Sequence, residues 1–269
     1  MAKALSTALG ESTSDYLVHA INPYLAVGLG LVGFLVVLSL QLSRRRYAAW
    51  SYWLAVAGVG VFGTMAADAL HVGAGVPYQA STILYGIVLV AVFVSWYRTE
   101  RTLSFHEIDT PRREIFYWLA VGATFAMGPA LGDLSASTVG LGYLDSGLVF
   151  AGVIAVPAIG YRWLRWNPVL AFWFAYVMTR PLGASFADYM GKPIIVGGRG
   201  WGDGPVAVAL ALAMLAVVVY LGVTRIDLQR LSARPQPLGD VPRPMEGAWS
   251  GDVDDPLRRA ESDPGQVPR

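Results

Sequence analysis

Six long apolar runs, nearly free of charged residues, limit what this chain can fold into more than any other feature. A helix needs about 20 apolar residues to cross roughly 30 Å of hydrocarbon. The runs lie at approximately 22–42, 51–70, 79–97, 115–134, 144–163 and 204–223. The chain is 55% hydrophobic and 14% charged, whereas soluble domains are about 25% charged. We therefore expect an all-α, polytopic membrane protein.

Two further segments are less clear on apolar content alone. Residues 167–189 are charge-free as far as Thr179 and then contain Arg180 and Asp188. Residues 1–20 are interrupted by four polar or charged side chains, Lys3, Glu11, Asp15 and His19. Charged side chains within a membrane span cost free energy, so hydropathy alone does not predict that these two segments are spans.

An internal repeat gives a reason to count both segments as spans. A hydrophobic residue, Gly, three residues, a small residue and Asp recur four times, and the Gly-to-Asp offset is always five. The pairs are Gly10 and Asp15, Gly63 and Asp68, Gly128 and Asp133, and Gly183 and Asp188. Trp53, Trp118 and Trp173 lie fifteen residues before the last three aspartates. For Asp15 this offset falls before Met1, so we expect the first helix to be clipped.

With these motifs the chain resembles a family of bacterial multi-spanning membrane proteins built from four tandem two-helix repeats of unknown function. The resemblance covers roughly residues 1–223 and implies almost nothing about mechanism. The repeat predicts about eight helices in a transmembrane domain over residues 1–226. Its four parallel units are approximately 1–46, 47–101, 112–165 and 166–226.

Arginines indicate how the repeats are oriented. They gather in the loops between repeats, at 44–46, 98–101, 112–113 and 162–165, whereas the turns within repeats contain only Lys192 and Arg199. By the positive-inside bias, the loops between repeats and both termini are expected to be cytoplasmic in a cell inner membrane. Residues 227–269 are rich in Pro, Arg and Asp without apolar periodicity, which predicts a disordered cytoplasmic tail.

The four aspartates are the main functional candidates. Fifteen residues carry a helix about 22 Å, so Asp15, Asp68, Asp133 and Asp188 should share one level in the outer third of the membrane. An ionised carboxylate in hydrocarbon costs several kcal/mol, so we expect the four to point into one polar site, beside Glu11 and Arg180. The alternative is structural, with each Asp bonded to a turn or to a neighbouring Ser or Thr.

Two departures from the repeat bear on the ligand. His19 follows Asp15 by four residues and His71 follows Asp68 by three, so each pair shares a helical face. Carboxylates with imidazole suit Mn²⁺, Fe²⁺ or Zn²⁺, and carboxylates alone suit harder ions. Against a metal role, both histidines lie near the outer interface. Arg180 occurs only in the fourth copy; we expect it to pair with Asp188 or another aspartate, and the alternative is an anionic substrate.

The small residues and the tryptophans predict packing. Each repeat glycine begins a small-x-x-x-small face, which favours close helix contact. The nine tryptophans mostly fall near predicted interfaces, as in an aromatic belt.

These features favour a transporter or channel for a small inorganic cation, a divalent metal or a proton-coupled substrate. The alternative is a non-transport scaffold or sensor with structural aspartates. The chain has no HExxH, GxSxG, Walker or Rossmann motif, so no enzyme is expected, and no cofactor is identified beyond a divalent ion as substrate. Expected partners are the lipid bilayer and a small ion, without nucleic acid; a homo-oligomer is compatible. Without cysteine there are no disulfides or thiolate sites.

Overall fold

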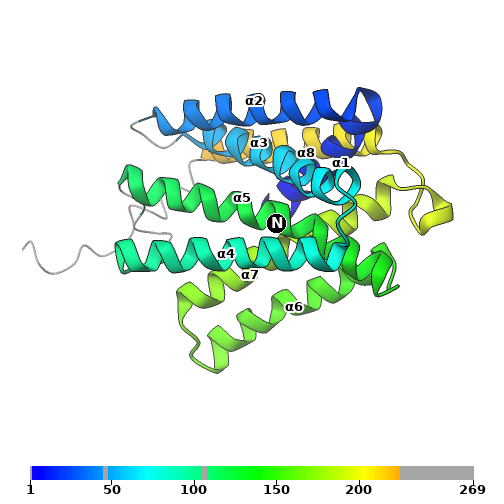
Figure 1. The fold of residues 1–269 in the computed structure, drawn as a ribbon. Coiled ribbons are helices and arrows are strands. Elements are labelled where there is room, and N and C mark those ends of the chain that lie inside the picture. Colours follow the sequence, from blue (N-terminus) through cyan, green and yellow to red (C-terminus); the bar gives the residue numbers. More distant parts are fainter. Residues whose placement is uncertain (1, 45–47, 105–107, 109, 225–269) are drawn as a thin grey trace, which may run out of the picture. The chain divides into compact units, whose positions relative to one another are not determined.

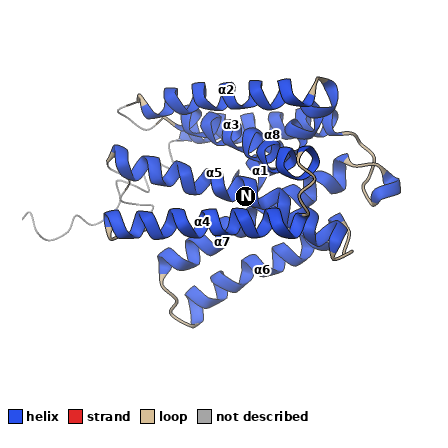
Figure 2. Ribbon diagram, viewed as in Figure 1, coloured by secondary structure: helices blue, strands red, loops and turns tan. Residues whose placement is uncertain are grey.

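The computed structural model describes residues 2–44, 48–104, 108 and 110–224. Eight α-helices account for most of this part, and no strand occurs in it (Figure 2). The helices are α1 (Ala2–Ala20), α2 (Pro23–Leu42), α3 (Ala49–Asp68), α4 (Tyr78–Glu100), α5 (Pro111–Asp133), α6 (Tyr143–Trp163), α7 (Pro168–Gly191) and α8 (Asp203–Thr224). Short helical turns, η1 (Ala69–Gly73), η2 (Leu134–Thr138) and η3 (Ile194–Val196), follow α3, α5 and α7. The tail predicted over residues 227–269 lies outside the described residues.

The all-α prediction is confirmed. Helices α2, α4, α6 and α8, together with α3 and α5 and their following turns, are long and apolar enough to cross a membrane. They coincide with the six apolar runs. Helices α1 and α7 correspond to the two more polar segments, which only the repeat predicted to be helices of the bundle. Both are continuous helices.

The first helices of the four repeats form a closed inner ring. Helix α1 packs on α3, α3 on α5, α5 on α7, and α7 on α1. Each second helix lies outside the ring, against the inner helix of the next repeat: α2 on α3, α4 on α5, α6 on α7, and α8 on α1 (Figure 1). Each repeat is therefore completed by its neighbour, and the last outer helix closes the ring on the first inner helix.

The repeat glycines are the points where neighbouring inner helices approach most closely. A Cβ on any of them would lie 2.5 to 2.7 Å from an atom of the next helix. The neighbour always stands three residues before the next repeat's own glycine. The pairs are Gly10 with Gly60, Gly63 with Phe125, Gly128 with Arg180, and Gly183 with Thr7. The predicted close helix contact is confirmed, with one geometry used four times.

Equivalent residues four positions apart share one face of each inner helix and form layers across the ring. Counting from the arginine-rich loops toward the aspartates, the layers are Lys3, Val56, Val121 and Tyr176; then Thr7, Gly60, Phe125 and Arg180; then Glu11, Thr64, Pro129 and Ala184; and last the four aspartates. All but Lys3, Asp68 and Asp133 are buried. Because the helices are parallel, the polar residues are separated by depth.

The repeat tryptophans correct one expectation. Trp53, Trp118 and Trp173 belong to a buried cluster at the arginine-rich end of the ring, together with Trp96, and do not face lipid. In the same cluster, the hydroxyls of Tyr52 and Tyr117 are 2.6 Å apart. Fifteen residues are close to four helical turns, so a tryptophan at this offset faces inward as its aspartate does. The other described tryptophans are at least partly exposed.

Candidate cation site

The four aspartates lie near the ends of the inner helices, all at one end of the ring. Asp68 and Asp133 end α3 and α5, Asp188 lies in the last turn of α7, and Asp15 lies five residues before the end of α1. Asp15 and Asp188 are buried, whereas Asp68 and Asp133 are half-buried. They lie close enough together, and to Glu11, for their negative charges to repel one another. The structure thus brings together the acids that the sequence singled out, with the two deepest aspartates on the adjacent helices α1 and α7.

Three acids form the tightest group. One carboxylate oxygen from each of Glu11, Asp15 and Asp188 lies within 4.8 Å of the others, and all three residues are buried. Hard cations bind oxygen at about 2.0–2.6 Å, so oxygens at these separations can share one ion. Glu11 is also fixed by Thr64, whose hydroxyl donates to its Oε2 at 3.1 Å.

Lys192, which the sequence analysis did not single out, caps this group. Its ammonium is ion-paired with Asp15 and lies 3.7 Å from Oδ1 of Asp188. Burial alone would lower the pKa of Lys192, but the carboxylates of Asp188 and Asp15 and the hydrogen bond to Asp15 outweigh it and raise the pKa above its usual range. The ammonium therefore stays charged in neutral solution. One signal was available, because Lys192 follows Asp188 by four residues, a spacing that places side chains together.

A glycine-rich turn positions Lys192. After α7 the chain folds back, and the amides of Arg199, Trp201 and Gly202 donate to the carbonyls of Tyr189, Met190 and Gly191. These are carbonyls that a helix end leaves without partners. A Cβ at Gly198 would lie 2.0 Å from the carbonyl oxygen of Lys192, so only glycine fits there. The turn thereby fixes Lys192 above the carboxylates.

Two of the aspartates, Asp133 and Asp188, lie near the start of an outer helix. Tyr78, at the start of α4, lies near the carboxylate of Asp133, and Tyr143, at the start of α6, lies near Asp188. Each tyrosine follows its own repeat's aspartate by ten residues but reaches the aspartate of the next repeat. The ten-residue offset can be read from the sequence. The aspartate that each tyrosine approaches cannot, because the sequence does not show that an outer helix packs on the inner helix of the next repeat.

The two candidate metal histidines lie apart from the three-acid group. The Nδ1 of His19 is 2.7 Å from the backbone oxygen of Asp15, and the side chain is exposed. The Nδ1 of His71 contacts the backbone oxygen of Val76, and its ring stacks on Tyr78. Both rings are engaged by their own turns, so the group of three described ligands consists of carboxylates alone.

Arg180 does not pair with Asp188, contrary to expectation. It is fully buried, and its Nη1 donates to Oγ1 of Thr7 at 2.8 Å. Its guanidinium lies 3.7 Å from the ring centroid of Phe125 and 4.5 Å from that of Tyr176. Eight residues separate Arg180 from Asp188, which is about 12 Å of helix. The side chain therefore crosses the ring two layers below the aspartates.

Comparison with known proteins identifies the repeat. Residues 51–102, 116–165 and 171–227 match the family model described as Repeat of Unknown Function (DUF347). The chain belongs to this family. The matched ranges correspond to the second, third and fourth repeats, as the sequence predicted. No curated protein and no solved structure was found to match.

The DUF347 repeats contribute unequally to the site. Glu11 occurs in the first repeat only, where the others have Thr64, Pro129 and Ala184, and Arg180 and Lys192 occur in the fourth only. With Asp15 and Asp188, these residues gather on α1, on α7 and just after α7. The deepest charges therefore lie where the ring of DUF347 repeats closes on itself.

Proposed function

We propose that this protein transports a small inorganic cation across a cell membrane, with Glu11, Asp15 and Asp188 as its ligands. The observation that carries the proposal is the approach of three buried carboxylates to within 4.8 Å of one another. Three like charges in a site of low dielectric repel strongly. A bound cation removes this repulsion, so the arrangement favours binding of positive charge.

The ligand chemistry favours a hard divalent ion. Carboxylate oxygens are the preferred ligands of Mg²⁺, Ca²⁺ and Mn²⁺, whereas Zn²⁺ and Cu²⁺ favour sites with imidazole or thiolate. The two histidines near this end contact their own turns, and the chain has no cysteine. Mn²⁺, Mg²⁺ and Ca²⁺ are therefore the ions to test first.

Lys192 acts as an internal competitor in this proposal. Its ammonium occupies the mouth of the acid group and neutralises part of its charge when no ion is bound. An entering divalent ion displaces the ammonium of Lys192 from the carboxylates. The glycine-rich turn that carries Lys192 then has a different position in the ion-bound state. The acids thus remain compensated in both states, which lowers the cost of holding them in the membrane.

The inner layers favour a transporter over an open channel. Below the acids, Phe125, Arg180 and Tyr176 are all buried, and the guanidinium lies over both rings. A fixed positive charge on a narrow path opposes the passage of cations. Release toward the other side therefore requires these side chains to move, as in alternating access. The arginine-rich loops and both termini face the cytoplasm in this proposal.

The test is Mn²⁺ uptake into vesicles containing the purified protein. Glu11→Gln and Asp188→Asn keep size and hydrogen bonding but remove charge, and each should reduce flux at least tenfold. Asp145→Asn is the matched control, because Asp145 is an exposed acid at the same end of the bundle, and its flux should match the wild type. Wild-type flux in folded Glu11→Gln and Asp188→Asn proteins would exclude this site.

The competing function, a scaffold or sensor with structural acids, rests on the ion pair that ties Asp15 to Lys192 across two repeats. Ligand binding distinguishes the two without any flux measurement. A cation that binds the folded state stabilises it by about 2.7 kcal/mol at one hundred times its Kd. Mn²⁺ should therefore raise the thermal stability of the wild type but not of Glu11→Gln. A purely structural cluster would give no ion-dependent shift.

A further inference from the structure

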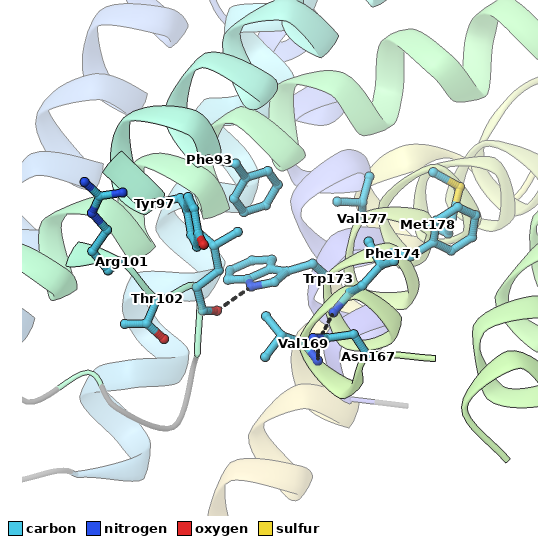
Figure 3. Close-up of a pocket in the computed structure, with 12 residues that line it drawn as sticks. Phe93, Tyr97, Arg101, Thr102, Asn167, Val169, Trp173, Phe174, Val177 and Met178 are labelled. Carbon is cyan, nitrogen blue, oxygen red and sulfur yellow. Dashed lines mark hydrogen bonds between the residues drawn. The ribbon is translucent and has the colours of Figure 1, made fainter. Parts of the chain in front are cut away.

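A groove at the opposite end of the bundle has no part in the cation site. It has a volume of about 570 Å³ and lies between the last turns of α4, the segment that follows α4, and the first half of α7 (Figure 3). The volume is within the range of pockets that hold small organic ligands. The aspartates are at the other end of the same inner helices, so a ligand here would not touch them.

The helix arrangement explains the opening. Helix α4 packs along α5 and α6 packs along α7, and α4 and α6 diverge toward the arginine-rich end (Figure 1). The part of α7 between them is left without an outer helix over it. Leu170 on α7 and Tyr97 on α4 are 60% and 53% exposed there. The groove is therefore open to the side of the bundle.

The groove is apolar on its floor and polar at one end. Phe93, Trp173 and Val177 form the floor, and the indole nitrogen of Trp173 is already satisfied because it donates to the Leu103 carbonyl at 2.9 Å. Arg101 and Asn167 lie at the end nearest the loops (Figure 3). Such a gradient fits a molecule with a hydrocarbon part and a charged end.

A second, smaller hollow adjoins the first. Its volume is about 300 Å³, it shares Phe93, Tyr97 and Leu103 with the groove, and it adds Arg98 to the rim. The nearby Arg112 and Arg113 are paired with Glu100. Among the described residues, no carboxylate is paired with Arg98 or Arg101. Two apolar hollows thus adjoin two arginines that have no described counter-charge.

We propose that this groove binds an anionic phospholipid of the leaflet on the arginine-rich side. One acyl chain lies in the groove against Trp173, the other in the adjoining hollow, and the phosphate contacts Arg98 and Arg101. Basic pockets between membrane helices on the cytoplasmic side are suited to anionic headgroups, because that leaflet carries negative charge. The N-terminus of the long helix α7 at the rim adds favourable partial charge. The proposal is independent of cation transport.

The experiment measures lipid binding to the full chain in detergent by native mass spectrometry. The wild type should retain phosphatidylglycerol more tightly than phosphatidylcholine of the same chain length. The double variant Arg98→Gln/Arg101→Gln should lose more than tenfold of the phosphatidylglycerol affinity, at about fivefold per arginine. It should lose a smaller factor of the phosphatidylcholine affinity, because choline already offsets the charge of that phosphate. Arg162→Gln/Arg165→Gln is the matched control, because it removes two arginines at the same end outside the groove, and it should behave as the wild type.

A second measurement locates the lipid. The chain has no cysteine, so Leu170→Cys can carry a single fluorophore at the groove. Brominated phosphatidylglycerol should quench this fluorophore at a low fraction of brominated lipid. The same fluorophore at Leu212→Cys, which is similarly exposed on α8, should need a higher fraction for equal quenching. Equal quenching at both sites, equal affinity for the two lipids, or an equal loss in the two arginine variants would each overturn the proposal.

Discussion

Lys192 illustrates how a single charge can depend on its neighbours. The carboxylates of Asp15 and Asp188 hold its pKa above the usual value, so the ion pair is maintained over the whole neutral range. Its position could not be predicted from hydropathy, because the glycine-rich turn after α7 returns the chain over the helix end. The aspartates could be predicted, since their common offset from glycine and tryptophan fixes both depth and face.

Replacing Lys192 by Met should destabilise the protein. The loss should be roughly 1–3 kcal/mol, below the 3–5 kcal/mol of a fully buried pair, because 24% of the side chain is exposed. Since the folded-state pKa is raised, the stabilisation is fully present below pH 10.5, the unperturbed value, and is lost as pH rises through the folded-state pKa. Thermal unfolding of both proteins from pH 7 to 10 should show a constant difference. A difference that vanishes between pH 7 and 9 would contradict the assignment.

The same substitution should tighten ion binding. With the competing ammonium gone, Mn²⁺ should raise the melting temperature of Lys192→Met more than that of the wild type at equal ion concentration. Arg199→Met, on the same turn but bonded to Tyr189, serves as control and should show the wild-type shift. An equal or smaller shift in Lys192→Met would mean that the lysine does not compete for the site.

Arg180 shows that opposite charges in a sequence are not enough to predict an ion pair. Opposite charges on one helix suggested a pair, but the helical rise between Arg180 and Asp188 already places them in different layers. The geometry instead places the guanidinium against Thr7 and Phe125 of neighbouring repeats. This contact depends on the order of helices around the ring, and no local pattern encodes it.

The helices themselves followed closely from the sequence, but their partners did not. Apolar length located all six predicted spans, and the repeat added α1 and α7. The pattern did not reveal that an outer helix packs on the inner helix of the next repeat. Lipid is as apolar as a helix surface, so an outer helix such as α2 is apolar all round and its sequence does not mark the contacted face.

The glycine contacts give a test at the level of the helix. In Gly10→Ala the new Cβ would lie 2.7 to 3.0 Å from the backbone of Gly60. Backbone atoms cannot rotate away, so α1 and α3 must separate, at a cost of about 1–3 kcal/mol. Gly28→Ala is the matched control, because nothing lies within 4 Å of its added Cβ. Unfolding in detergent should show a loss for Gly10→Ala and none for Gly28→Ala; equal stability of the two would refute the close approach.

At the scale of the molecule, the ring is closed by contacts between its first and last repeats. Helix α1 is the least apolar helix, and its buried residues include Ser6, Thr7, Glu11 and Ser14. Packing against α3, α7 and α8 supplies what its own hydrophobicity does not. The polarity of the first helix and the acid group have the same origin, because the buried polar face of α1 carries Glu11 and Asp15, two of the three proposed ligands.

This arrangement predicts which way the chain faces. All four inner helices run parallel, so the acid end must lie on one side of the membrane and every loop between repeats on the other. Arginine bias assigns the loops to the cytoplasm. Because the chain has no cysteine, single cysteines can report each side. Val139→Cys and Ile195→Cys, 65% and 93% exposed in the outer turns, should react with an impermeant thiol reagent on intact cells.

Ser43→Cys and Leu164→Cys, both exposed in loops between repeats, should react only after the membrane is permeabilised. These two positions follow outer helices of different repeats, so an odd number of crossings anywhere between them would place them on opposite sides. Reaction of all four positions in line with this pattern would also require α7 to cross the membrane, despite its charges, because only α7 lies between Leu164 and Ile195. Labelling of only one of Ser43→Cys and Leu164→Cys on intact cells would show that a repeat does not return to its starting side, and a closed ring of four parallel inner helices would then be impossible. Labelling of both would contradict the cytoplasmic assignment of the loops.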